Sequence, residues 1–131
     1  MLTRFILLLI MIGNFSSKAE VADPTWDAVS DGFRQGNARV LSNYLANSID
    51  LSILSSDKTL SKTQAVSELE SFFNTNKPKS FNQVHQGNSK GRDSYYCIGE
   101  LETSNGKYRV YVYFKSAGAS SQIQEIRMDK M

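Results

Sequence analysis

His85 is the only histidine in this 131-residue sequence, and it is the side chain best suited to acid–base chemistry near neutral pH. In the predicted strand FNQVHQG, alternation places it on the same face as Phe81 and Gln83. A catalytic histidine needs a carboxylate partner. The acids in or near predicted strands are Asp50, Glu100, Glu102 and Glu125. Because the sequence places none of them beside His85, a structural histidine hydrogen-bonded at the sheet edge is the competing interpretation.

Cys97, the only cysteine, lies in the strand pattern YYCIGEL, where a free thiol behaves as a small buried apolar side chain. A reactive thiol needs a neighbouring base or a helix N-terminus, and the sequence places neither there. One histidine and one cysteine on different strands do not form a ligand set, and no carboxylates have calcium-loop spacing. The chain also lacks a phosphate-binding glycine loop. We therefore expect no metal and no cofactor.

The N-terminus has the pattern of a secretory signal peptide. A basic start ending at Arg4 precedes the apolar run from Phe5 to Ile12, and Ser17-Lys18-Ala19 places small residues at the cleavage positions. The apolar run is much shorter than the roughly 20 residues that span a bilayer, so we expect no membrane anchor in the mature protein. Residues 1–19 are predicted to be a signal peptide and residues 20–131 a single domain, periplasmic or secreted after cleavage near Ala19.

Cleavage also changes the charge. It removes two of the 15 basic residues, Arg4 and Lys18, and none of the 13 acidic ones, so the formal charge of +2 falls to zero. No block of like charge remains in the mature chain. Binding to nucleic acid through charge is therefore not expected.

The first half of the mature chain has helical spacing. Trp26, Val29 and Phe33 recur on one helical face after Asp23-Pro24, and Gly36 is a stop signal. Asn37 is predicted to cap a second short helix. A strand is expected at 49–54, and Ser61 with Gln64 forms a capping box for a third helix that ends before Pro78.

The second half alternates as an antiparallel meander. Strands are predicted at 81–86, 94–103, 108–115 and 123–128. Asn105-Gly106 predicts a tight hairpin whose two central residues both have positive φ. Helices followed by consecutive hairpins are typical of an α+β fold, in which N-terminal helices pack on a curved antiparallel sheet.

The strand KYRVYVYFK has bulky side chains on both faces. Tyr108, Val110, Val112 and Phe114 form the more apolar set, which we assign to the face beneath the helices. The second set contains Arg109, Tyr111 and Tyr113. Tyrosine and arginine are enriched at protein interfaces, so this face predicts a sheet-to-sheet homodimer. The alternative is a solvated face on which the long side chains lie flat.

Several segments resemble a known family. NKPKSFNQVHQGNSKG, YCIGELETSNGKYRVYVYF and IQEIRM are similar to a family of small exported bacterial proteins known only as domain of unknown function 4783. GNARVLSNYLANSIDLSIL and SKTQAVSELESFF resemble the same family. The resemblance covers nearly all of the mature chain. It implies the cone-shaped α+β fold of the nuclear transport factor 2-like superfamily, also described as cystatin-like, and dimerisation through the sheet. It brings no assigned catalytic residues.

The fold alone does not decide the function. We favour a non-catalytic exported binding module, a homodimer that holds a small apolar ligand or a protein partner. The alternative is an isomerase or dehydratase type of enzyme that uses His85 in the cone. The candidate pocket residues are Trp26, Tyr44, Phe73, His85 and Tyr96.

Overall fold

The computed structural model describes residues 24–89, 93–117 and 120–131. The expected signal peptide and its cleavage site lie outside these residues. The described elements are α1 (Pro24–Gln35), α2 (Ala38–Ser42), β1 (Leu45–Ile53), β2 (Ser56–Ser61), α3 (Lys62–Thr75), β3 (Pro78–Asn88), β4 (Ser94–Thr103), β5 (Gly106–Ala117) and β6 (Ser120–Lys130). All of the predicted helices and strands are present, and β2 was not predicted.

Two of the three predicted helix starts are confirmed in atomic detail, and the third, at Asp23, lies outside the described residues. The Asn37 side chain accepts hydrogen bonds from the backbone N–H groups of Arg39 and Val40 at the start of α2. At the start of α3, Ser61 Oγ accepts from the Gln64 N–H at 3.3 Å, and the Gln64 side chain accepts from the Ser61 N–H at 3.2 Å. These bonds satisfy N–H groups that a helix leaves unpaired at its first turn.

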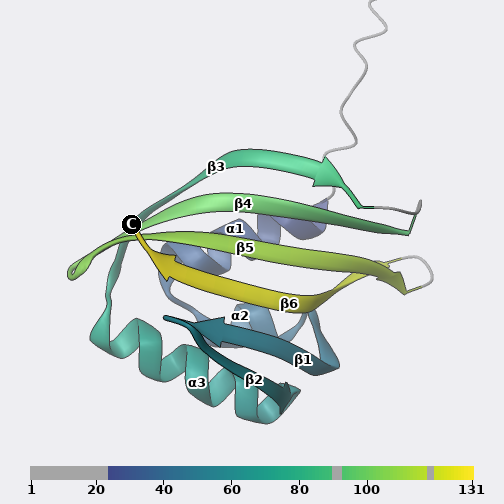
Figure 1. Ribbon diagram of the computed structural model, residues 1–131, viewed down its shortest axis with the longest axis horizontal. Coiled ribbons are helices and arrows are strands. Elements are labelled where there is room, and N and C mark those ends of the chain that lie inside the picture. Colours follow the sequence, from purple (N-terminus) through teal and green to yellow (C-terminus); the bar gives the residue numbers. More distant parts are fainter. Residues whose placement is uncertain (1–23, 90–92, 118–119) are drawn as a thin grey trace, which may run out of the picture.

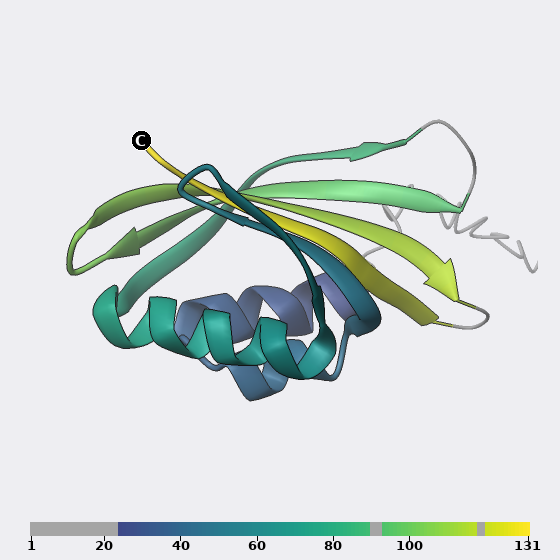
Figure 2. The same cartoon turned by 60° about the horizontal axis from the view of Figure 1, so that its bottom comes forward.

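The strands form one sheet in the order β2-β1-β6-β5-β4-β3. Neighbouring strands are antiparallel except for β1 and β6, which pair in parallel. Figure 1 looks onto one face of this curved sheet, and Figure 2 shows that the three helices cover the opposite face. We call the helix-covered face the inner face and the uncovered one the outer face. The predicted α+β architecture is therefore confirmed.

The inner face of β5 carries the predicted apolar set. Tyr108, Val110, Val112 and Phe114 are all buried. Aromatic side chains fill the space between this face and the helices. The Phe33 ring lies 5.2 Å from that of Phe81 and 6.2 Å from that of Phe73, and Trp26 contacts both Phe81 and Phe114 edge-on.

Two hairpin turns differ from the sequence prediction. Thr103 pairs with Gly106, so Ser104 and Asn105 are the central turn residues, and positive φ occurs at Gly106 (116°) rather than at both predicted positions. Asn105 is held by hydrogen bonds, since its side-chain amide donates to the Thr75 carbonyl at 2.6 Å. The unpredicted β1–β2 turn instead has two consecutive non-glycine residues with positive φ, Leu54 (51°) and Ser55 (69°).

Candidate functional site

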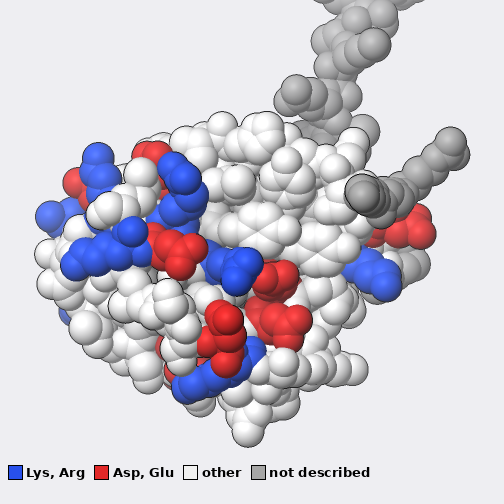
Figure 3. All heavy atoms as spheres, in the orientation of Figure 1, with Lys and Arg blue, Asp and Glu red and all other residues white. Residues whose placement is uncertain are grey.

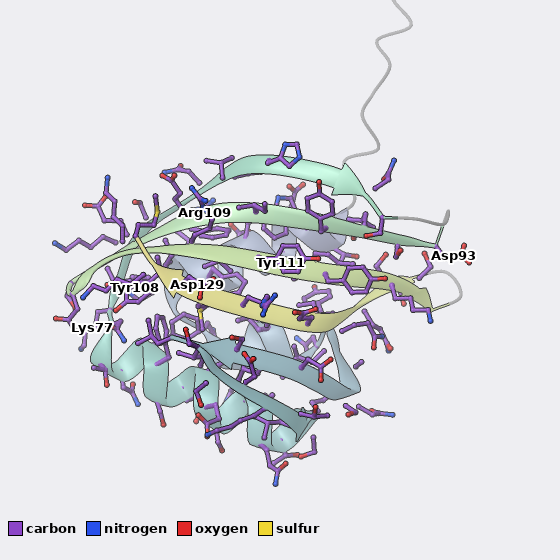
Figure 4. The ribbon with its side chains drawn as sticks, in the orientation of Figure 1. Lys77, Asp93, Tyr108, Arg109, Tyr111 and Asp129 are labelled. Carbon is purple, nitrogen blue, oxygen red and sulfur yellow. The ribbon has the colours of Figure 1, made fainter. Side chains whose placement is uncertain are left out.

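The most distinctive feature of the outer face is a group of half-buried apolar side chains at its centre. We call it the aromatic patch, and it consists of Tyr96, Ile98, Tyr111 and Tyr113. Strand pairing builds it: Tyr96 lies opposite Tyr113 and Ile98 opposite Tyr111 on β4 and β5. The Tyr96 and Tyr111 rings stack with centroids 5.7 Å apart. Figure 4 shows Tyr111 near the middle of this face.

Charged side chains surround the patch in alternating sign. On one side, Arg109 is in register with Glu100 on β4 and Asp129 on β6. On β6, Arg127 lies opposite Tyr111 and Glu125 opposite Tyr113. Figure 3 shows uncharged atoms over the middle of the sheet, basic groups gathered toward the end that carries the β4–β5 hairpin, and acidic groups beside the uncharged area. Such a face can bind a partner that presents both apolar surface and charge.

The structure corrects the predicted position of His85. The β3–β4 pairing shifts between Gln83 and His85, which is a β-bulge, so His85 pairs with Ile98 and lies on the outer face. It therefore does not share a face with Phe81 and does not enter the cone. Within the described residues, its ring contacts Tyr96, with the Nε2 to hydroxyl distance at 3.2 Å, and no carboxylate.

The other candidate pocket residues divide between core and surface. Trp26 and Phe73 are buried, and the indole N–H of Trp26 donates to Gln83 Oε1 at 2.6 Å. Tyr44 is half-buried against the core. Tyr96 lies on the outer face rather than in the cone, because its position on β4 alternates with the buried Cys97. These five residues therefore do not line one pocket.

The environment of Tyr111 alters its acidity. Burial raises the pKa of Tyr111 above its usual 10.0, and the nearby charge of Glu125 raises it further. The phenol therefore stays protonated to a higher pH than that of an ordinary tyrosine. The sequence analysis identified Tyr111 and Tyr113 as interface candidates from the alternation of a single strand. It missed Ile98, because only the strand register places this residue between Tyr111 and His85.

No helix in the described part of the chain is long and apolar enough to cross a membrane. The described residues define a protein with the nuclear transport factor 2-like fold. An NTF2-like protein from Cytophaga hutchinsonii matches with a TM-score of 0.63 at 9% identity, over 82% of this chain and 93% of its own.

The family follows from closer relatives. The family model of DUF4783, a domain of unknown function, matches residues 26–129, so the chain belongs to this family. A DUF4783 family protein from Bacteroides uniformis is 35% identical over 80% of this chain and 95% of its own, with a TM-score of 0.75. A second, from Bacteroides ovatus, is 33% identical over 79% of this chain and 93% of its own, also with a TM-score of 0.75. A comparison with functionally curated proteins finds no match.

Proposed function

We propose that this protein is an exported, non-catalytic binding module that pairs with a second copy of itself through the outer face of its sheet. The observation that carries the proposal is the aromatic patch. Tyr96, Ile98, Tyr111 and Tyr113 form a continuous apolar surface on a face that none of the described helices covers. Grouped apolar side chains of this kind mark interaction sites on soluble proteins.

A second copy suits this face because its charges alternate. In a symmetric dimer, the same surface is used on both sides, so each residue type needs its complement elsewhere on the same face. Arg109 and Arg127 lie among Glu100, Glu125 and Asp129 on the three central strands. The tyrosines supply rigid apolar bodies with polar tips, which is the composition of interface centres.

Binding is favoured over catalysis by the position of the candidate base. The alternative enzyme would need His85 in the cone beside an acid, whereas His85 is exposed on the outer face next to Tyr96. A ligand in the cone is disfavoured because Phe33, Phe73 and Phe81 pack there with Trp26. Export is supported by the basic start, apolar run and small residues before position 20.

The test is the oligomeric state of the protein expressed from its full-length sequence and purified. Analytical ultracentrifugation should show a dimer at micromolar concentration. Truncating a central interface aromatic costs about 2 kcal/mol or more, so Tyr111→Asn should raise the dimer dissociation constant at least about 30-fold. The matched control is Val84→Asn, which removes an exposed apolar side chain outside the patch and should leave the dimer intact.

Circular dichroism must show that both variants are folded. A wild-type monomer at tens of micromolar, or equal effects of Tyr111→Asn and Val84→Asn on association, would overturn the proposal.

A further inference from the structure

A charged hollow lies on the outer face beside the aromatic patch, where β6, β1 and β2 run next to one another. Its volume is about 260 Å³. Pockets for whole drug-sized ligands have volumes of roughly 300–1,000 Å³. The hollow is therefore of a size for one charged head group. The residues that matter for its chemistry are Asp50, Ser52, Asp57, Thr59, Glu125 and Arg127.

The hollow has more negative than positive charge. Asp50 and Glu125 are in register on neighbouring strands, so their carboxylates repel each other. Arg127 lies 3.5 Å from Glu125 through Nε and Oε1, which is longer than an ordinary charged hydrogen bond. The other lining cation, Lys58, is 3.2 Å from Glu68 of α3 and is thus paired outside the hollow. The lining therefore carries three carboxylates and one guanidinium that is not paired outside the hollow, and the Asp50 carboxylate also accepts a hydrogen bond from the Thr59 hydroxyl at 2.8 Å.

Ser52 provides a second, independent observation. It is 6% exposed and lies in register between Arg127 on β6 and Asp57 on β2. Its hydroxyl has no hydrogen-bond partner among the described residues, although every fully enclosed side-chain polar atom there has one. The hydroxyl must therefore reach the open space of the hollow that Ser52 lines. The hydroxyl is therefore a free donor and acceptor at the wall of the hollow, available to a group bound there.

We propose that this hollow binds a guanidinium or alkylammonium group. Both groups carry a positive charge and several N–H donors, and both need oxygen acceptors. The carboxylates of Asp50, Asp57 and Glu125 and the hydroxyl of Ser52 supply these acceptors. The cation comes either from a free small molecule or from a side chain of a copy docked on the aromatic patch.

The site rests on the proposed function only for the second of these sources, so the experiment separates the two. The probe is methylguanidinium chloride, titrated into ¹⁵N-labelled Tyr111→Asn protein at constant ionic strength. This variant should be monomeric, so no second copy should cover the outer face. We expect saturable amide shifts at Ser52, Asp57 and Arg127, with a dissociation constant on the order of 1–10 mM. Methylurea, the neutral analogue, should give no saturable shift.

Variants locate the binding. Asp50→Asn with Glu125→Gln should weaken methylguanidinium binding about tenfold or more, and Ser52→Ala about threefold. Glu102→Gln is the matched control, since it removes a carboxylate from β4 outside the hollow and should change the affinity less than about twofold. The proposal is overturned by absence of binding, by an equal response to methylurea, or by equal effects of the hollow variants and Glu102→Gln.

The source of the cation is identified by measuring dimerisation of the Asp50→Asn, Glu125→Gln variant with Tyr111 retained. If it weakens the dimer by clearly more than Glu125→Gln alone does, the cation belongs to the facing copy. If the dimer is unchanged while methylguanidinium binding is lost, the site takes a free small cation. If the protein is monomeric, the proposed function fails and the titration still tests the hollow.

Discussion

At the scale of single residues, the Tyr111 phenol makes the stability of the folded protein depend on pH. Burial, with a further contribution from the Glu125 charge, raises the pKa of its phenol in the folded protein above 10.0. In the unfolded chain the phenol ionises near the ordinary value. Between the two pKa values the folded state therefore binds more protons than the unfolded state, and the free energy of unfolding falls as pH rises.

We therefore expect the wild type to lose stability above about pH 10 in a way that Tyr111→Phe does not. The measurement is urea denaturation at about pH 9 and about pH 11, followed by the fluorescence of Trp26, the single tryptophan. The contribution is fully present below the unfolded pKa, so this titration should cause no difference at neutral pH. Equal losses of stability in the two proteins would contradict this prediction.

His85 shows what sequence alternation cannot determine. The side chains from Asn82 to Gln86 are all exposed, so no buried residue fixes which face each one takes. A bulge there costs little and leaves no mark in the hydrophobic pattern. In β5, by contrast, buried residues alternate strictly, and the predicted inner face is correct at every position from Tyr108 to Phe114.

At the scale of elements, the predictable parts of the fold are those with a local cause. The caps at Asn37 and Ser61 depend on side chains next to the helix they begin, and both were found. The strand β2 was missed because its residues are mostly exposed and polar, with only Leu60 partly buried. The hollow was missed because its residues come from β1, β2 and β6, which are distant in sequence and meet only through the sheet order.

The β1–β2 turn stores strain that a substitution can remove. Leu54 and Ser55 both have positive φ, the pattern of a type I′ turn, which favours Asn followed by Gly. Leu54 is 52% exposed, so its side chain contributes little packing, and its N–H bond to the Met128 carbonyl is made by the backbone. Leu54→Asn with Ser55→Gly should stabilise the protein by about 1–2 kcal/mol.

Urea denaturation would measure this gain, with the slope expected to stay constant. Thr59→Asn with Leu60→Gly, placed within β2 rather than at the turn, is the matched control and should be destabilising, since strands disfavour both residues. A turn variant no more stable than the wild type would show that the positive φ values are not a significant source of strain.

At the scale of the whole molecule, the aromatic core determines whether the cone can hold a ligand. Phe33 is fully buried and touches the rings of both Phe73 and Phe81. Removing it should open an apolar cavity between α1 and the sheet. Phe33→Ala should cost about 3–5 kcal/mol. Because natural domains have only about 5–15 kcal/mol of stability, the milder Phe33→Leu is a second variant should the first fail to fold.

The contrast between wild type and variant then tests the filled cone directly. Dry apolar cavities of the size of a lost ring bind benzene, and a ligand that binds only the folded state raises its stability. Saturating benzene should therefore raise the urea midpoint of Phe33→Ala, more weakly that of Phe33→Leu, and leave the wild type unchanged. If the wild type gained as much as the variants, its interior would already have room for a small apolar ligand. The cone, rather than the outer face, would then be the better candidate for the binding site.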